Sequence, residues 1–179
     1  MTGNSSATEA RPASAFVITR EFDAPRDLVW KAHSEAERLK QWWGPKGFAM
    51  AHCTLDFRPG GIFHYALRSP NGQEMWGRFA YREIAPREKI VFASSFSDPD
   101  GAIVRAPFSE TCPLEFLNTL TLFEHDGRTT LTITVAPINA DDAEMATFES
   151  MRDSMRQGFG GTFDQLAAHL AKDTASSAR

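Results

Sequence analysis

The chain has 179 residues, of which 42% are hydrophobic and 23% charged, a composition typical of one soluble domain. Its formal net charge of −4 gives no reason to expect nucleic acid or an anionic membrane as a partner. No apolar run approaches the roughly 20 residues that cross a bilayer, and the start of the chain lacks the apolar core of a secretion signal. The two cysteines do not indicate an oxidising compartment, so we expect a cytoplasmic protein.

The two ends of the chain are small and polar in composition. Residues 1–15 and 172–179 contain too few large apolar side chains to form a core, which predicts a disordered lead and a disordered tail. Between them we expect a single domain over residues 16–171.

The predicted elements begin with a strand and two short helices. The segment 16–22 combines β-branched and aromatic residues, which favours a strand. Pro25 suits the first turn of a helix that continues to about residue 33. Ser34 with Glu37 three places later predicts a capping box for a second helix, which ends before the dipeptide Gly44-Pro45.

The middle of the chain alternates between apolar and polar residues. Turn signals at Pro70-Asn71-Gly72 and Asp126-Gly127 separate neighbouring runs, as hairpins require. The alternation predicts a sheet with one buried face and one solvent-exposed face. The six strands expected here are 50–57, 62–69, 74–84, 89–96, 114–125 and 128–136.

From Asp141 onward the pattern is helical. Asp141 and Glu144 have capping-box spacing, and the apolar residues that follow recur every three or four positions, which predicts one long amphipathic helix. Consecutive antiparallel strands curl, and one long helix can cover only their concave side. We therefore expect an α+β fold in which a curved antiparallel sheet of six to seven strands grips a C-terminal helix. The apolar series is Phe148, Met151, Met155, Phe159, Phe163, Leu166 and Leu170.

Three glycines interrupt this helical pattern. Gly158, Gly160 and Gly161 should each cost roughly 1 kcal/mol relative to alanine inside a helix. One hypothesis is that they produce a bend or a gap where the helix and the sheet would otherwise close on each other. The alternative is a local break between two ordinary helical pieces.

Side chains that share faces of the predicted strands and helix form a largely apolar, aromatic set. Asn118 falls among apolar neighbours, where an unpaired amide would cost about 1–3 kcal/mol, so it needs a backbone partner, a water or a ligand. The set is typical both of a small-molecule pocket and of an ordinary core, and both interpretations stay open. The candidate ligand-binding residues are Trp43, Phe63, Tyr65, Phe79, Phe92, Ser94, Phe96, Phe116, Asn118, Leu120, Met151, Met155 and Phe159.

Motifs that would indicate chemistry are absent from the sequence. The five histidines and two cysteines do not have the spacing of metal-ligand motifs, so no metal and no cofactor is predicted, and no residue is assigned a catalytic role. Of the adjacent Trp42 and Trp43, one is expected to anchor the short helices and the other to border an opening. The long segment 98–113 is a candidate lid or partner surface.

Four stretches together resemble a known family: REFDAPRDLVWKAHSEAERLKQWWGP, LDFRPGGIF, EHDGRTTLTIT and MRQGFGGTFDQLAAHL. They are similar to bacterial proteins grouped with the activator of heat-shock chaperone ATPase homologues, within the START/Bet v 1-like (SRPBCC) superfamily. The resemblance extends from Phe16 to Leu170. The common form of the last stretch has tryptophan after its first glycine, where this chain has Phe159. The resemblance implies a helix-grip fold with a hydrophobic cavity between the sheet and the long helix.

Three functions are compatible with these observations. The leading hypothesis is a non-catalytic protein that binds a small hydrophobic molecule in the cavity between sheet and helix. A second is a protein-interaction module, associated with a chaperone or with another copy of itself, that uses its outer surface or the segment 98–113. A third is an enzyme of the cyclase or hydrolase type acting on an aromatic or polyketide-like substrate, as some members of the superfamily do.

Overall fold

The computed structural model describes residues 15–177, so the predicted disordered lead lies almost entirely outside the described residues. The chain forms an α+β fold, as its patterns predict. The helices are α1 (Arg26–Ser34), α2 (Ala36–Trp42), α3 (Asp142–Ser150) and α4 (Arg152–Ser177). The strands are β1 (Phe16–Phe22), β2 (Ala49–Leu55), β3 (Ile62–Arg68), β4 (Glu74–Ala85), β5 (Lys89–Ser97), β6 (Ile103–Val104), β7 (Phe116–His125) and β8 (Arg128–Pro137).

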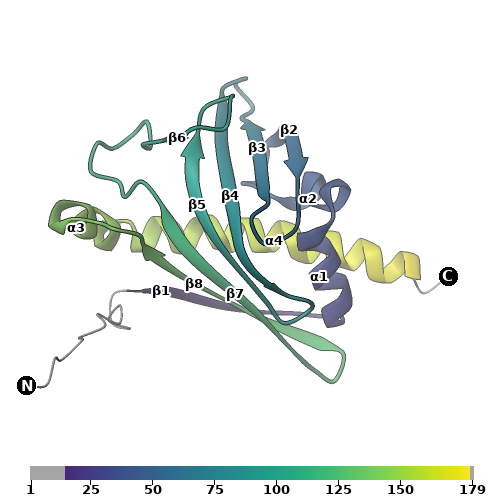
Figure 1. Cartoon of the computed structure of the whole chain (residues 1–179). Coiled ribbons are helices and arrows are strands. Elements are labelled where there is room, and N and C mark those ends of the chain that lie inside the picture. Colours follow the sequence, from purple (N-terminus) through teal and green to yellow (C-terminus); the bar gives the residue numbers. More distant parts are fainter. Residues whose placement is uncertain (1–14, 178–179) are drawn as a thin grey trace, which may run out of the picture.

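The strands form one antiparallel sheet in the order β1-β8-β7-β5-β4-β3-β2, with the two-residue strand β6 paired to β5. The sheet therefore has eight strands rather than the expected six to seven, because β6 lies within the segment predicted to be a loop. The sheet curves around α4, which crosses one of its faces, and α1 and α2 lie near the C-terminal half of that helix (Figure 1). This is the arrangement that the strand and helix periodicities predict.

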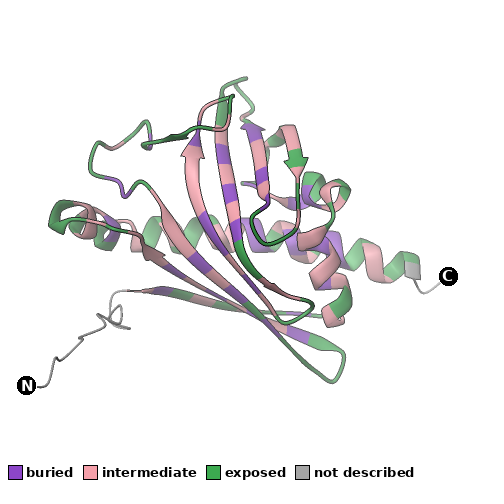
Figure 2. Cartoon of the chain, viewed as in Figure 1, coloured by how far each residue is buried: buried purple, intermediate pink, exposed green. Residues whose placement is uncertain are grey.

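Alternation along the strands separates a buried face from an exposed one. Buried and less buried residues alternate along the central strands in Figure 2. In β8, Leu131, Ile133 and Val135 are buried, whereas Thr132 hydrogen-bonds across to Thr19 on the outer face, at 3.1 Å between the hydroxyl oxygens. Because successive side chains in a strand point to opposite faces, this pattern directs the apolar side chains toward α4.

The helical part of the chain differs from the prediction in three places. The predicted single helix is two, because the chain is interrupted at Met151 between α3 and α4. Helix α4 continues to Ser177, so the prediction of a disordered tail is wrong for residues 172–177. The Ser34 capping box is also wrong, because α2 begins after Glu35, which makes no side-chain cap.

The capping box at the start of α3 is confirmed. The Asp141 carboxylate accepts a hydrogen bond from the Glu144 backbone N–H at 2.8 Å, and the Glu144 carboxylate accepts one from the Asp141 N–H at 2.9 Å. The two bonds satisfy backbone donors that the first turn of a helix leaves free. They place the beginning of α3 directly after the end of β8.

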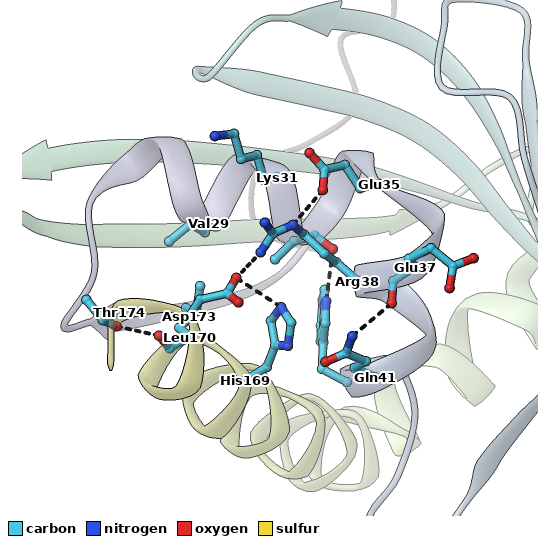
Figure 3. A network of polar contacts seen from close by, with 12 residues as sticks. Val29, Lys31, Glu35, Glu37, Arg38, Gln41, His169, Leu170, Asp173 and Thr174 are labelled. Carbon is cyan, nitrogen blue, oxygen red and sulfur yellow. Dashed lines mark hydrogen bonds and ion pairs between the residues drawn. The ribbon is translucent and has the colours of Figure 1, made fainter. Parts of the chain in front are cut away.

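Polar contacts connect the C-terminal half of α4 to α1 and α2. The Arg38 side chain of α2 forms ion pairs with Glu35 and with Asp173 of α4, and His169 lies beside the same Asp173 carboxylate (Figure 3). The Gln165 side chain donates to the Gly44 carbonyl at 3.0 Å. These contacts fix this half of α4 against the short helices, whereas its N-terminal half crosses the other part of the sheet.

Candidate functional site

A cavity of about 270 Å³ lies between the concave face of the sheet and the N-terminal half of α4. Its wall is mostly apolar and aromatic. Twelve of the thirteen predicted residues line it: Trp43, Tyr65, Phe79, Phe92, Ser94, Phe96, Phe116, Asn118, Leu120, Met151, Met155 and Phe159. Alternation within the strands and the helix therefore identified about half of the wall.

Phe63 is the predicted residue that the structure places elsewhere. Its side chain is fully buried behind the wall, stacked on Tyr65 with ring centroids 4.8 Å apart and edge-on to Phe79 at 5.3 Å. Phe63 shares a strand face with Tyr65 and pairs with Leu55 of β2 and Phe79 of β4. It supports the wall without reaching the cavity.

Sequence reasoning missed a second group of wall residues. Val135 pairs with Asn118 and Ile133 with Leu120, so the register of the neighbouring strand could have identified both. Ile90, Tyr81 and Phe163 share a strand or helix face with predicted wall residues, so the same periodicities could have identified them. The others come from the start of β4, from Ser95 of β5 and from α1 and α2, where the three-dimensional arrangement brings them to the cavity. The missed residues are His33, Leu39, Met75, Trp76, Gly77, Tyr81, Ile90, Ser95, Ile133, Val135 and Phe163.

Aromatic rings form a continuous part of the wall. Phe79 and Phe92 stack with centroids 4.2 Å apart, and Trp43 meets Phe79 edge-on at 5.3 Å. Offset-stacked and edge-to-face pairs of this kind add about 0.5–1.5 kcal/mol beyond the area they bury. Trp42 is buried and donates its indole N–H to the Ala32 carbonyl at 2.9 Å, so it anchors the short helices. Trp43 borders the cavity. These are the two roles predicted for the pair.

Gly77 makes room for the Tyr65 hydroxyl. A Cβ atom at this position would lie 2.6 Å from the Tyr65 hydroxyl oxygen, closer than real Cβ contacts allow.

Burial raises the pKa of Tyr65 to about 12, and the Trp43 indole opposes this with a smaller effect, so Tyr65 is neutral at pH 7. The indole N–H of Trp43 is itself buried and has no partner within normal hydrogen-bond geometry among the described residues.

Asn118 has found the partners that its apolar surroundings require. Its side-chain nitrogen donates to the Ser94 hydroxyl at 2.8 Å and to the Phe116 carbonyl at 3.1 Å. Because the Phe116 carbonyl can only accept, the atom that faces it must be the amide nitrogen, which settles the orientation of the side chain. The amide oxygen accepts no hydrogen bond from any described residue.

His33 is a neutral histidine on the cavity wall. Its Nδ1 lies 2.8 Å from the Val29 carbonyl oxygen, so Nδ1 carries the proton and Nε2 keeps a lone pair. Burial lowers the pKa of His33 to about 4, with the Val29 bond opposing the shift. At neutral pH the wall therefore has no charge at this position.

The three helix glycines are not explained by close packing. An added Cβ at Gly158, Gly160 or Gly161 would meet no atom within 4 Å, and none of the three lines the cavity. Helix α4 runs through them without a break, so no interruption occurs at their positions. They leave open space beside the helix, but that space is not the cavity itself.

Groups suited to covalent or metal chemistry do not gather at the cavity. Within residues 15–177, no cluster of three or more His, Cys, Asp or Glu side chains could hold a metal ion. Burial raises the pKa of the half-buried Cys53 thiol, which makes it a poorer nucleophile. None of the helices in the described part of the chain is both long and apolar enough to span a membrane.

Comparison with solved structures places the fold among known proteins. A protein from Arthrobacter aurescens is 26% identical, with 89% of this chain and 87% of that chain covered and a TM-score of 0.75. One from Nitrosomonas europaea is 22% identical, with 93% and 99% covered and a TM-score of 0.72. One from Mycobacterium smegmatis is 24% identical, with 89% and 92% covered and a TM-score of 0.72. No curated protein matches the sequence significantly.

These neighbours share the helix-grip architecture, in which a curved antiparallel sheet surrounds a long C-terminal helix, as the resemblance of the four stretches implies. The family described as activator of Hsp90 ATPase homolog 1-like protein matches residues 23–171, which is most of the chain. This protein therefore belongs to the activator of Hsp90 ATPase homolog 1-like family.

Proposed function

We propose that this protein binds a small, mostly apolar molecule in the cavity between the sheet and α4 without transforming it. The observation that carries the proposal is the cavity itself, about 270 Å³ in a region where strands and helix would otherwise interdigitate. Pockets for small molecules begin near about 300 Å³ and have apolar walls with a few polar groups that orient the ligand. The aromatic wall with Asn118, Ser94 and Tyr65 has that composition.

The polar groups on the wall favour binding over catalysis. The Ser94 hydroxyl accepts a hydrogen bond from the Asn118 amide nitrogen and donates to no base among the described residues, and the His33 Nδ1–H engages a backbone carbonyl. A nucleophilic serine requires a base within hydrogen-bond reach, and the Asn118 amide nitrogen is only a donor. Bound compounds should therefore be recovered unchanged, and turnover of any bound compound would favour the enzyme hypothesis instead.

Thermal-shift measurements and native mass spectrometry against a library of apolar compounds test the proposal. A ligand at 100 times its Kd adds about 2.7 kcal/mol, which raises the Tm of a domain of this size by about 5–10 °C. Met155→Trp places an indole at the cavity wall and should abolish the shift. Met145→Trp makes the same change on α3, away from the cavity, and should retain it. The proposal is wrong if no compound binds, or if Met155→Trp binds as well as the unaltered chain.

Interaction with a protein partner is a second candidate, favoured by one surface observation. In the segment 98–113, Phe108 is 65% exposed, and Ile103 and Val104 are also exposed. Exposed apolar side chains near one another are typical of protein-binding surfaces. The family description suggests an Hsp90-type chaperone as the partner to test. Stimulation of its ATPase that is lost in Phe108→Ser would support this function, and failure to bind the chaperone would reject it.

A further inference from the structure

The polarity of the cavity wall restricts which molecules it can accept. Among the described residues that line it there is no lysine, arginine, aspartate or glutamate. Two nearby arginines are already engaged: the Arg78 guanidinium donates to the Gly101 carbonyl at 2.7 Å, and Arg105 pairs with Glu144 at 2.8 Å. A ligand carboxylate would therefore lose its hydration without gaining a cation, which is costly in an apolar environment.

Asn118 and Ser94, which are hydrogen-bonded to each other, supply a neighbouring acceptor and donor on the wall, apart from the buried indole N–H of Trp43. Asn118 is 4% exposed, and both protons of its amide nitrogen are used, by the Ser94 hydroxyl and the Phe116 carbonyl. No described residue donates to its amide oxygen. The Ser94 oxygen accepts the Asn118 bond and keeps its own proton to donate. The pair therefore presents one acceptor and one donor side by side.

That combination is complementary to a hydroxyl group. A hydroxyl both donates and accepts, whereas an ether or ketone only accepts and a hydrocarbon does neither. A buried acceptor left unsatisfied costs about 1–3 kcal/mol, so an occupant that cannot donate to Asn118 is penalised. The size of the cavity adds a second restriction: an apolar cavity of about 150 Å³ holds one benzene ring, and this one, at about 270 Å³, has room for two fused rings.

We infer that the cavity selects an uncharged aromatic alcohol of two-ring size, whose hydroxyl donates to the Asn118 amide oxygen and accepts from the Ser94 hydroxyl. The rings lie against the Phe79 and Phe92 side chains, which are already arranged for offset or edge contacts. This inference rests on the proposed function and specifies the ligand class of the same site. It also predicts rejection of ionised fatty and aromatic acids.

Four matched probes test it at pH 7.5: 2-naphthol, naphthalene, 2-methoxynaphthalene and 2-naphthoate. We expect 2-naphthol to bind about 5- to 10-fold more tightly than naphthalene, which corresponds to one net hydrogen bond. The methyl ether should lose that advantage because it cannot donate. The carboxylate should bind at least about 100-fold more weakly than the alcohol, because it would be buried as an uncompensated charge. Calorimetry or native mass spectrometry gives the four affinities.

Two variants test whether Asn118 and Ser94 cause the preference for the alcohol over the hydrocarbon. Asn118→Leu should bring the naphthol-to-naphthalene ratio close to one while naphthalene still binds, and Ser94→Ala should reduce the ratio if the leucine variant does not fold. Thr119→Val changes the adjacent residue of β7, which does not line the cavity, and should leave the ratio unchanged. Equal binding of alcohol and hydrocarbon, or tight binding of the carboxylate, would overturn the inference but leave the proposed function standing. Failure of all four probes to bind would also overturn the inference, whereas the proposed function fails only if no compound of the apolar library binds.

Discussion

The two halves of helix α4 cover regions of the interior that differ in packing, although the same sheet lies opposite both. Its C-terminal half packs Leu166 and Leu170 into a closed core, where both are at most 2% exposed. Its N-terminal half presents Met155 and Phe159, which are only partly buried and line the cavity. Short helices and polar contacts close one end. The cavity is bordered mainly by the sheet and α4, and the short helices contribute only His33 and Leu39 to its wall.

One layer of side chains therefore provides both stability and a binding space. Fully buried apolar side chains contribute most of the stability per residue, because their whole surface is removed from water and they contact neighbours on every side. Side chains at the cavity lose part of that contact. The closed end should therefore hold the fold together, and the open end should tolerate change in stability while controlling binding.

The largest expected effect comes from truncating a side chain at each end. Leu166→Ala removes a fully buried side chain and should lower the free energy of unfolding by about 2–5 kcal/mol. Met155→Ala should cost less than half as much, because its side chain already borders open space. Urea unfolding of both variants at pH 7 measures the difference. Equal losses would contradict the division into closed and open ends.

Acid should destabilise the protein through His33. The pKa of this residue falls from 6.5 in the unfolded chain to about 4 when folded, so the unfolded state binds more protons between these values. Stability should therefore be full above pH 6.5 and fall by about 3 kcal/mol on acidification to pH 4. His33→Gln should reduce the slope of stability against pH. A slope remains from other groups, including His169, whose pKa burial also lowers. An unchanged slope in His33→Gln would show that His33 does not titrate in this way.

At the open end, the position of Gly77 has no room for a larger side chain. Gly77→Ala would drive a methyl group against the Tyr65 side chain and should cost about 1–3 kcal/mol. Tyr65→Phe removes the nearest of the clashing atoms, so the double variant should recover part of the loss. A double-mutant cycle on thermal unfolding gives the coupling between the two positions. Simple additivity of the two changes would indicate that the contact does not limit packing.

The smallest effect concerns the glycines of α4. Gly158→Ala should stabilise the helix by up to about 1 kcal/mol, because the added methyl meets no neighbour. Ala168→Gly, at an exposed position of the C-terminal half, should destabilise it by a similar amount. Calorimetric Tm values compare the two variants. If Gly158→Ala fails to stabilise or weakens probe binding, then glycine at this position has a role that packing does not reveal.

Local patterns predicted most of the fold and about half of the cavity wall. Alternation placed Asn118, Phe116 and Leu120 on one face, and helical spacing placed Met155 and Phe159 opposite them, because both periodicities are properties of neighbouring residues in the chain. The break at Met151 and the helical segment 172–177 were missed. The helical segment 172–177 includes Asp173, which pairs with Arg38 of α2, a contact between residues far apart in the sequence.

The amino-acid order alone was sufficient for the type and succession of the elements and for which side chains share a face. The three-dimensional packing decided that Phe63 lies behind the wall while Tyr65, two residues later, reaches it, and that His33 joins the wall from α1. It also decided that the core is solid under one half of α4 and hollow under the other. The physical reason is that a void depends on the curvature of the whole sheet and the position of the helix across it, which no local period encodes.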